Sequence, residues 1–192
     1  MEGSHSGLVR LFGEQLCRKA SQVRILYPPN MIMKTIFCNF LDRANKDGTI
    51  TLKPLGKAKN KAPKPMLPGW KDVVTEIIIN KRYAKGLDGI EDYSHVIIVY
   101  WLGQVKECHL KHHPQGRKDI PFGGIFACRC PQRPNRLAIS TVKLLSRKNN
   151  NIKVEGLDIL DGTPILDIKP YTPHYDLVSK ARVPAWVNRL IF

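Results

Sequence analysis

The chain has 192 residues, enough for one compact domain with a core, and hydrophobic residues make up 43% of it, which excludes an intrinsically disordered protein. The sequence contains no apolar run of the roughly 20 residues that a membrane-spanning helix needs. Its first 30 residues also lack the apolar core and cleavage site of a secretory signal, so we expect a cytoplasmic protein. The formal net charge of +15 favours a polyanionic partner such as RNA over a surface that is merely well solvated.

Residues 1–30 show neither strand nor helix periodicity. The segment Gln22–Pro29 can be reverse-translated into a string that contains the T-arm pattern of a tRNA gene and a terminal CCA. We therefore expect residues 1–30 to be disordered or a spurious upstream extension, with the true start at Met31 or Met33. The domain expected to fold is 31–192.

Alternating or β-branched runs predict seven strands, in chain order residues 49–55, 73–79, 95–102, 124–129, 138–145, 152–159 and 164–168. The Lys-, Pro- and Gly-rich residues 56–70 and the polar residues 103–121 predict loops, and 81–87 a short helical turn. Because 95–102 is apolar throughout, it should be the central strand. This pattern predicts an all-β fold with minor α, a closed or nearly closed barrel. No Rossmann fingerprint follows the first strand.

Basic residues concentrate in two stretches without Asp or Glu, which indicates a nucleic-acid-binding face rather than chance. The stretch 120–154 carries Arg129, Arg133, Arg136, Lys143, Arg147, Lys148 and Lys153, and the other carries Lys53, Lys57, Lys59, Lys61 and Lys64.

The five cysteines are odd in number and irregularly spaced, which argues against a disulfide framework. Cys128 and Cys130 read as reduced, mostly buried thiols, because their spacing is not that of a Cys-x-x-Cys site. The run from Cys108-His109 to His112-His113 resembles a metal cluster only superficially, since no second cluster has matched spacing. We expect a basic, RNA-facing loop there and no metal site.

Four segments stand out as motifs: Gly86–His95, Gly124–Asn135, Val154–Tyr171 and Arg182–Val187, with the runs RPN at 133–135 and LDGTPILDIKPY at 160–171. Together and in this order they resemble the TrmO family, the tRNA N6-threonylcarbamoyladenosine methyltransferases, over roughly residues 50–190. The resemblance implies a single-sheet β-barrel methyltransferase acting as a homodimer. It further implies S-adenosylmethionine as the donor and N6 of threonylcarbamoyladenosine next to the tRNA anticodon as the acceptor. The family usually continues RPN as Pro-Ile-Gly, whereas this chain has Arg136-Leu137-Ala138.

The matching segments and their chemistry give the candidate site. Eight residues are candidates for binding the cofactor: Ser94, His95, Arg129, Asn135, Asp158, Ile159, Leu160 and Asp161. Four are candidates for binding the substrate: Arg133, Asp167, Lys169 and Tyr171. The general base, if one is used, is unknown; His95, Asp158 and Asp161 are candidates.

Each of these residues also has a structural interpretation. The carboxylates of Asp158 and Asp161 could bind the ribose diol or ammonium group and favour the sulfonium, or Asp161-Gly162 could simply form a turn. An arginine beside a proline-rich bend could hold a carboxylate or phosphate with two hydrogen bonds. His95 could be a structural histidine. Asp167, Lys169 and Tyr171 alternate, and could line a substrate entrance or form a salt-bridged ladder.

Two alternatives remain open from the sequence. One is a non-enzymatic RNA-binding barrel, which would share the basic face but have no cofactor pocket. The other is a methyltransferase with the same cofactor and another acceptor.

Overall fold

The computed structural model describes residues 49–62 and 69–191. Its strands are β1 (Gly56–Lys59), β2 (Val74–Ile79), β3 (His95–Trp101), β4 (Lys111–His112), β5 (Gly123–Gly124), β6 (Leu137–Lys148), β7 (Asn151–Glu155) and β8 (Pro164–Pro170). Its helices are α2 (Pro173–Asp176) and the 3-10 helices η1 (Lys81–Leu87), η2 (Ile90–Asp92), η3 (Pro114–Gly116), η4 (Ile125–Ala127) and η5 (Ala185–Arg189). The expectations for residues 1–30 and for the start at Met31 or Met33 lie outside the described residues.

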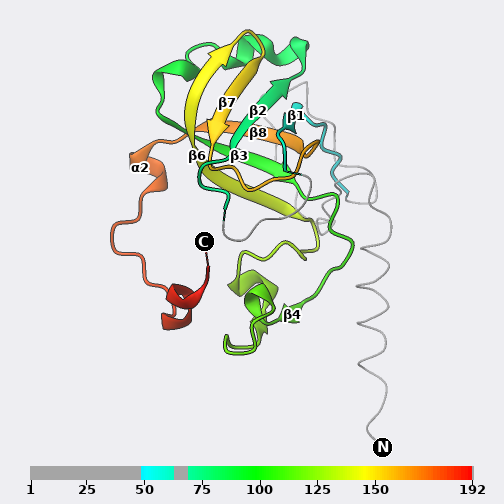
Figure 1. Cartoon of the computed structure of the whole chain (residues 1–192), viewed down its shortest axis with the longest axis vertical. Helices are drawn as coiled ribbons and strands as arrows, with labels where there is room; N and C mark the ends of the chain where they lie inside the picture. The colour runs from blue at the N-terminus through cyan, green and yellow to red at the C-terminus, as the bar shows by residue number, and fades with distance from the viewer. Residues whose placement is uncertain (1–48, 63–68, 192) are drawn as a thin grey trace, which may run out of the picture.

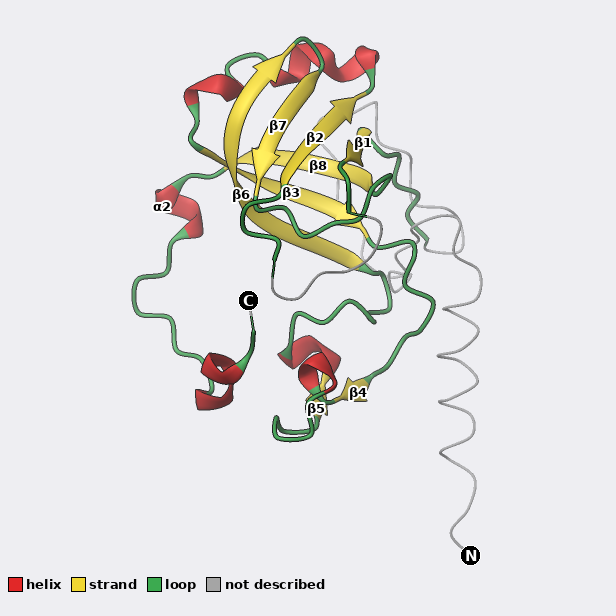
Figure 2. Ribbon diagram, in the orientation of Figure 1, coloured by secondary structure: helices red, strands yellow, loops and turns green. Residues whose placement is uncertain are grey.

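Six antiparallel strands close into a barrel in the order β1-β2-β7-β6-β3-β8 (Figure 2). The all-β prediction is confirmed, with six barrel strands in place of about seven. Residues 95–102 correspond to β3, as predicted, which pairs with β6 on one side and β8 on the other. Because the barrel is closed, each of its six strands has two neighbours and none of them is central.

The period-2 alternation of the strands fills the barrel interior. Along β3 the side chains of Val96, Ile98 and Tyr100 are buried, while those between them are half-buried on the outer face. Ile77, Ile152, Val154 and Ile165 from neighbouring strands join them in the core, all with no accessible surface. The segment after β7 adds Leu157 and Ile159, which are also buried, at one end of the barrel.

Two predicted strands and one predicted loop are wrong. Residues 49–55 are irregular, and the first strand is β1, inside the segment predicted as a loop. Pairing is possible there because a Cβ on Gly56 would lie 2.1 Å from the carbonyl oxygen of Ile78, so only glycine allows this approach. Residues 124–129 form the turn η4, with only Gly123 and Gly124 paired to β4.

Two further parts lie outside the barrel (Figure 1). The small sheet β4-β5 and its turns form a lobe below the barrel, and residues 172–191 run from β8 down to that lobe as an arm. The far end of the arm is fastened: Gln115 donates from Nε2 to the carbonyl of Ile191 at 2.6 Å, and Arg117 donates to the carbonyl of Arg189.

Candidate functional site

Tyr100 organises the end of the barrel that faces the lobe. It is the next-to-last residue of β3. Its hydroxyl lies 3.0 Å from the hydroxyl of Ser140 on β6 and 3.2 Å from the backbone carbonyl oxygen of Asp158. A buried tyrosine hydroxyl needs such partners. Burial raises the pKa of Tyr100, and Asp158 and Arg129 both lie near enough to act on that pKa in opposite directions. Two predicted cofactor residues therefore meet here.

Asp158 lies in the loop between β7 and β8, which crosses this barrel end. The residue is accessible, yet its carboxyl group is partly withdrawn from water, and this burial raises its pKa. Its neighbours Ile159 and Leu160 are held inward, Ile159 buried and Leu160 half-buried. Asp158 is thus the acidic group of this loop that is both reachable and desolvated.

Asp161 has a different position in the same loop. Its Oδ1 accepts a hydrogen bond of 3.0 Å from the backbone N–H of Asn60, just after β1. Asn60 in turn donates from Nδ2 to the carbonyl of Ile159 at 2.9 Å and to the hydroxyl of Thr75 at 3.2 Å. Gly162 follows with a φ of +77°, and so the turn interpretation of Asp161-Gly162 matches the geometry. We call Asn60, Asp161 and their bonds the loop clamp.

The two arginines of the proline-rich bend point to different partners. Arg129 is exposed and donates from Nη2 to the carbonyl of Ile139 on β6 at 2.8 Å. Arg133 donates from Nη1 to the carbonyls of Ile125 at 3.0 Å and Cys128 at 2.7 Å. Arg133 therefore shapes its own loop, while Arg129 lies against the barrel near Tyr100. Asn135 lies exposed at the end of this bend.

Ser94, His95 and Tyr171 meet at the other end of the barrel. The Ser94 hydroxyl lies 2.9 Å from His95 Nδ1, and the rings of His95 and Tyr171 contact edge to face at 6.4 Å between centroids. His95 and Tyr100 lie five residues apart on β3, which corresponds to roughly 16 Å along a strand. The structure thus separates His95 from Arg129 and Asp158.

Asp167 and Lys169 lie on the outer face of the barrel. They form an ion pair of 2.7 Å along β8, opposite Val99 and Ile97 of β3. Both side chains are substantially exposed, which limits what the pair adds to stability. The ladder interpretation fits this geometry, and the pair is set apart from the Tyr100 cluster on the inner face.

Arg136 stands where the resemblance leads one to expect a proline. It is buried and has a φ of +54°, which a proline ring, locked near −65°, cannot adopt. The next residue that departs from the family, Ala138, lies directly opposite Tyr100 in the β3–β6 register. The departures therefore sit at the same barrel end as Asp158.

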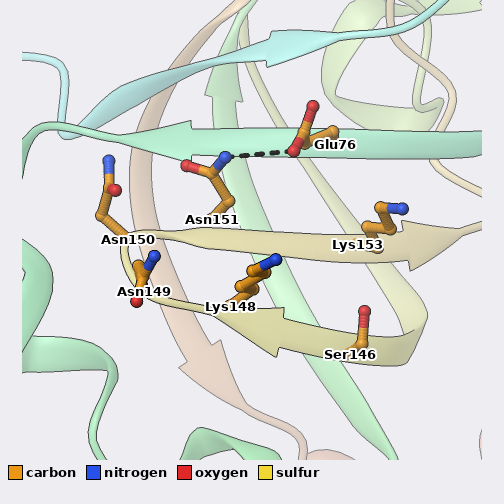
Figure 3. A pocket seen from close by; sticks show the side chains of 7 residues that line it. All are labelled: Glu76, Ser146, Lys148, Asn149, Asn150, Asn151 and Lys153. Carbon is orange, nitrogen blue, oxygen red and sulfur yellow. Dashed lines mark hydrogen bonds between the residues drawn. The ribbon is translucent and has the colours of Figure 1, made fainter.

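The predicted basic face is partly neutralised by acids from outside the acid-free stretch. Arg147 contacts Asp88 at 2.6 Å and Glu91 at 3.3 Å, and Lys143 contacts Glu155 at 3.6 Å. Lys148 and Lys153 line a polar hollow of about 290 Å³ on the β6–β7 hairpin (Figure 3). Its other lining residues are Glu76, Ser146, Asn149, Asn150 and Asn151, and Asn151 donates to Glu76 at 3.0 Å. The carboxylate that lines this hollow, Glu76, is engaged by that hydrogen bond, and none of the predicted site residues lines it.

Sequence reasoning missed Tyr100, Ser140 and Asn60. Tyr100 had one available signal: a tyrosine in an otherwise aliphatic buried strand needs a polar partner for its hydroxyl. Asn60 had none, since it follows a lysine-rich strand that was itself predicted as loop. Its role depends on a residue 101 positions away.

The family model described as the tRNA-methyltransferase O N-terminal domain matches residues 56–177. A protein of Archaeoglobus fulgidus named S-adenosyl-L-methionine-binding protein is 38% identical over 135 residues, which cover 67% of this chain and 94% of that protein. A relative from Pyrococcus abyssi is 38% identical over 119 residues, 62% of this chain and 63% of that protein.

The barrel is similar to solved structures. The crystal structure of TrmO from Pseudomonas aeruginosa superposes with a TM-score of 0.57 at 27% identity, covering 70% of this chain and 62% of that chain. A second TrmO crystal structure gives 0.57 at 30% identity. Among the described residues, no helix combines the length and apolarity that crossing a membrane requires.

Proposed function

This chain belongs to the family of the tRNA-methyltransferase O N-terminal domain, and on that premise we propose that it methylates N6 of threonylcarbamoyladenosine next to the anticodon of a tRNA. The family match over residues 56–177 carries the proposal. The relative named for binding S-adenosylmethionine supports that molecule as the donor. The excess of basic residues supports a polyanionic acceptor.

Two groups at the barrel end around Asp158 have the chemistry to bind this donor, which supports the proposal. S-adenosylmethionine supplies a methyl group activated by a positive sulfonium, together with a carboxylate, an ammonium group, a ribose diol and adenine. The Asp158 carboxyl is reachable, and burial raises its pKa, so a cation placed beside it would stabilise the carboxylate form. Arg129, fixed against Ile139, offers a guanidinium for a carboxylate.

We assign the general base to Asp158 rather than to the two other candidates. The acceptor nitrogen resembles that of a urea and must lose its proton as it is methylated. Asp161 uses its carboxylate in the loop clamp, and His95 lies at the opposite end of β3. A carboxyl group whose pKa lies above its ordinary value is a better proton acceptor than a fully solvated one.

Two further features complete the proposal. Arg129 or Arg133 would read the carboxylate of the threonyl group, and the Asp167, Lys169 and Tyr171 side would meet the tRNA. We infer a homodimer, supported by the apolar side chains that the arm exposes. Acting on tRNA would place the enzyme in the cytoplasm.

A methyl-transfer assay tests this. The full chain is mixed with methyl-labelled S-adenosylmethionine and tRNA that either carries or lacks threonylcarbamoyladenosine. Label confined to the modified tRNA is the expected result, with at least a tenfold loss in kcat for Asp158→Asn. Glu155→Gln, a change to a half-buried acid in the neighbouring strand, serves as the matched control.

Other outcomes would favour the alternatives. Label in both tRNAs would mean a methyltransferase with another acceptor. Binding of tRNA without binding of the donor would mean a non-enzymatic RNA-binding barrel.

A further inference from the structure

Three side chains with the chemistry of metal ligands meet in the lobe below the barrel. The Nε2 atom of His112 lies 3.1 Å from the Sγ atom of Cys128, and the ligand atoms of His112, Cys128 and Cys130 all lie within 4.8 Å of one another. The sequence placed these residues in two unrelated groups, a histidine-rich loop and a pair of buried thiols. The fold unites one histidine from the first with both members of the second.

The backbone of the lobe holds the two segments in this arrangement. His112 lies on β4 opposite Gly123 of β5, and the backbone N–H of Ile125 donates to the carbonyl of Leu110 at 2.9 Å. On the far side of the cysteines, the N–H of His109 donates to the carbonyl of Gln132 at 3.1 Å. Backbone hydrogen bonds therefore join the two segments on both sides of the three side chains, and this holds the side chains close together.

The ligand set and spacing suit zinc. Tetrahedral zinc binds thiolate at about 2.3 Å and imidazole at about 2.0 Å, which puts these ligand atoms about 3.5–3.8 Å apart. In the structure these atoms are at most 4.8 Å apart, so side-chain movements of about 1 Å would bring them to the distances that zinc requires. Two sulfurs and one imidazole favour zinc over magnesium or calcium, which prefer oxygen.

Cys128 is the middle member of the group. It contacts His112 on one side, and a side-chain hydrogen bond joins it to Cys130 on the other. All three residues are half-buried, which keeps the site open to an incoming ion while shielding its ligands from bulk water.

We propose that His112, Cys128 and Cys130 bind one zinc ion, with solvent in the fourth position, and that this ion fastens β4 to the loop carrying Arg129 and Arg133. Both thiols release their protons to solvent on binding. The consequence for the loop follows from Arg133, which donates to the carbonyl of Cys128 at 2.7 Å. Fixing Cys128 fixes the backbone that Arg133 braces and that leads directly into Arg129.

The test measures metal in the full chain, reduced and freed of any affinity tag. Zinc is quantified by plasma mass spectrometry after dialysis, and cobalt(II) replaces it to report thiolate ligands by absorption. We expect one zinc per chain, sulfur-to-cobalt charge-transfer bands, and at least a tenfold loss of zinc affinity in Cys128→Ser, Cys130→Ser and His112→Ala. His174→Ala, an exposed histidine on α2, should leave zinc affinity unchanged.

Several results would overturn the proposal. They are a folded, reduced chain that takes up no zinc, a disulfide between Cys128 and Cys130 in the protein isolated from cells, and cobalt spectra without charge-transfer bands. Equal loss in Cys108→Ser would overturn the assignment of three protein ligands. Circular dichroism of each variant separates loss of metal from loss of fold, because the barrel contains none of these three residues.

Discussion

At the scale of single residues, the side chains around Tyr100 show how one barrel end becomes chemically distinct. The tyrosine hydroxyl binds a serine on one strand and a backbone carbonyl in a loop, so it ties the position of Asp158 to the core. Asp158 itself is left facing outward with its carboxyl partly desolvated. The core thus positions a group whose ionisation costs free energy in the folded chain.

That cost predicts a pH dependence of stability. Because the folded-state pKa of Asp158 lies above its ordinary value of 3.8, the folded chain binds its proton more tightly than the unfolded chain does. The contribution of Asp158 to stability therefore falls as pH rises from about 3.8 through the folded pKa, and stays low above it. Asp158→Asn should lack this fall, so that the variant gains stability relative to the parent as pH rises.

Thermal unfolding of the two proteins between pH 3 and pH 7 would measure this difference. Asp72→Asn, at an exposed position before β2, is the control and should follow the parent at every pH. A difference in Tm between Asp158→Asn and the parent that stays constant with pH would contradict the raised pKa.

At the scale of elements, the loop clamp joins β1 to the loop that carries Asp158. Asp161→Ala removes the acceptor for the Asn60 N–H and should cost about 0.5–1.5 kcal/mol of unfolding free energy. The Tm should fall by about 2–4 °C per kcal/mol. Because the clamp positions Asp158 rather than reacting, the KM for the donor should rise at least threefold while kcat changes less.

Differential scanning fluorimetry and initial rates at varied donor concentration test the clamp, with Asp72→Ala as the matched exposed acid. Asn60→Ala should reproduce the same pattern, since it removes the bonds to Ile159 and Thr75. A kcat at background level with an unchanged KM in Asp161→Ala would instead make Asp161 a catalytic residue.

The bend that leads into β6 gives a second prediction for an element. Arg136→Pro, which restores the residue expected from the family, should destabilise this chain by more than about 1 kcal/mol, because proline cannot adopt the φ of +54° found here. Arg136→Gly is the control, since glycine accepts that φ. Denaturant unfolding would show the proline variant clearly below the glycine variant; equal stability would mean that the bend follows a path compatible with proline.

At the scale of the whole molecule, the sequence predicted what depends on local pattern. The alternating and β-branched runs predicted β2, β3, β6 and β8. The strand predicted at 152–159 was too long at its C-terminal end. In the structure β7 ends at Glu155, because the next residue, Gly156, has a φ of +87°. Features that depend on distant partners were not predicted from the sequence. Strand β1 is one of them, because it pairs with β2 only where Gly56 allows the two backbones to approach closely. The candidate site residues lie at two different ends of the barrel, with His95 at one and Asp158 at the other. Membership of a motif did not reveal which residues from different strands would share a barrel end.

The arm bears on the assembly of the whole molecule. Its far end is fastened to the lobe by Gln115 and Arg117, while its middle exposes Tyr175 at 87%, Leu177 at 63%, Val178 at 70% and Val183 at 58%. Apolar side chains gathered on one segment indicate a protein interface. In the homodimer that we propose, a second copy of this chain covers them.

Replacing two of these side chains by acids should therefore weaken the dimer. Leu177→Glu combined with Val178→Glu places two charges in the interface without touching the barrel core, and should raise the dimer dissociation constant at least tenfold. Light scattering coupled to size exclusion measures this, with a parent mass near twice 21.8 kDa and a variant mass that approaches 21.8 kDa on dilution. Leu110→Glu, at 53% exposure in the lobe, is the matched control and should remain dimeric. A parent chain that stays monomeric at all concentrations would contradict the dimer. A dimer that tolerates both acids would place the interface elsewhere, and the half-buried outer face of β3 would be the next surface to test.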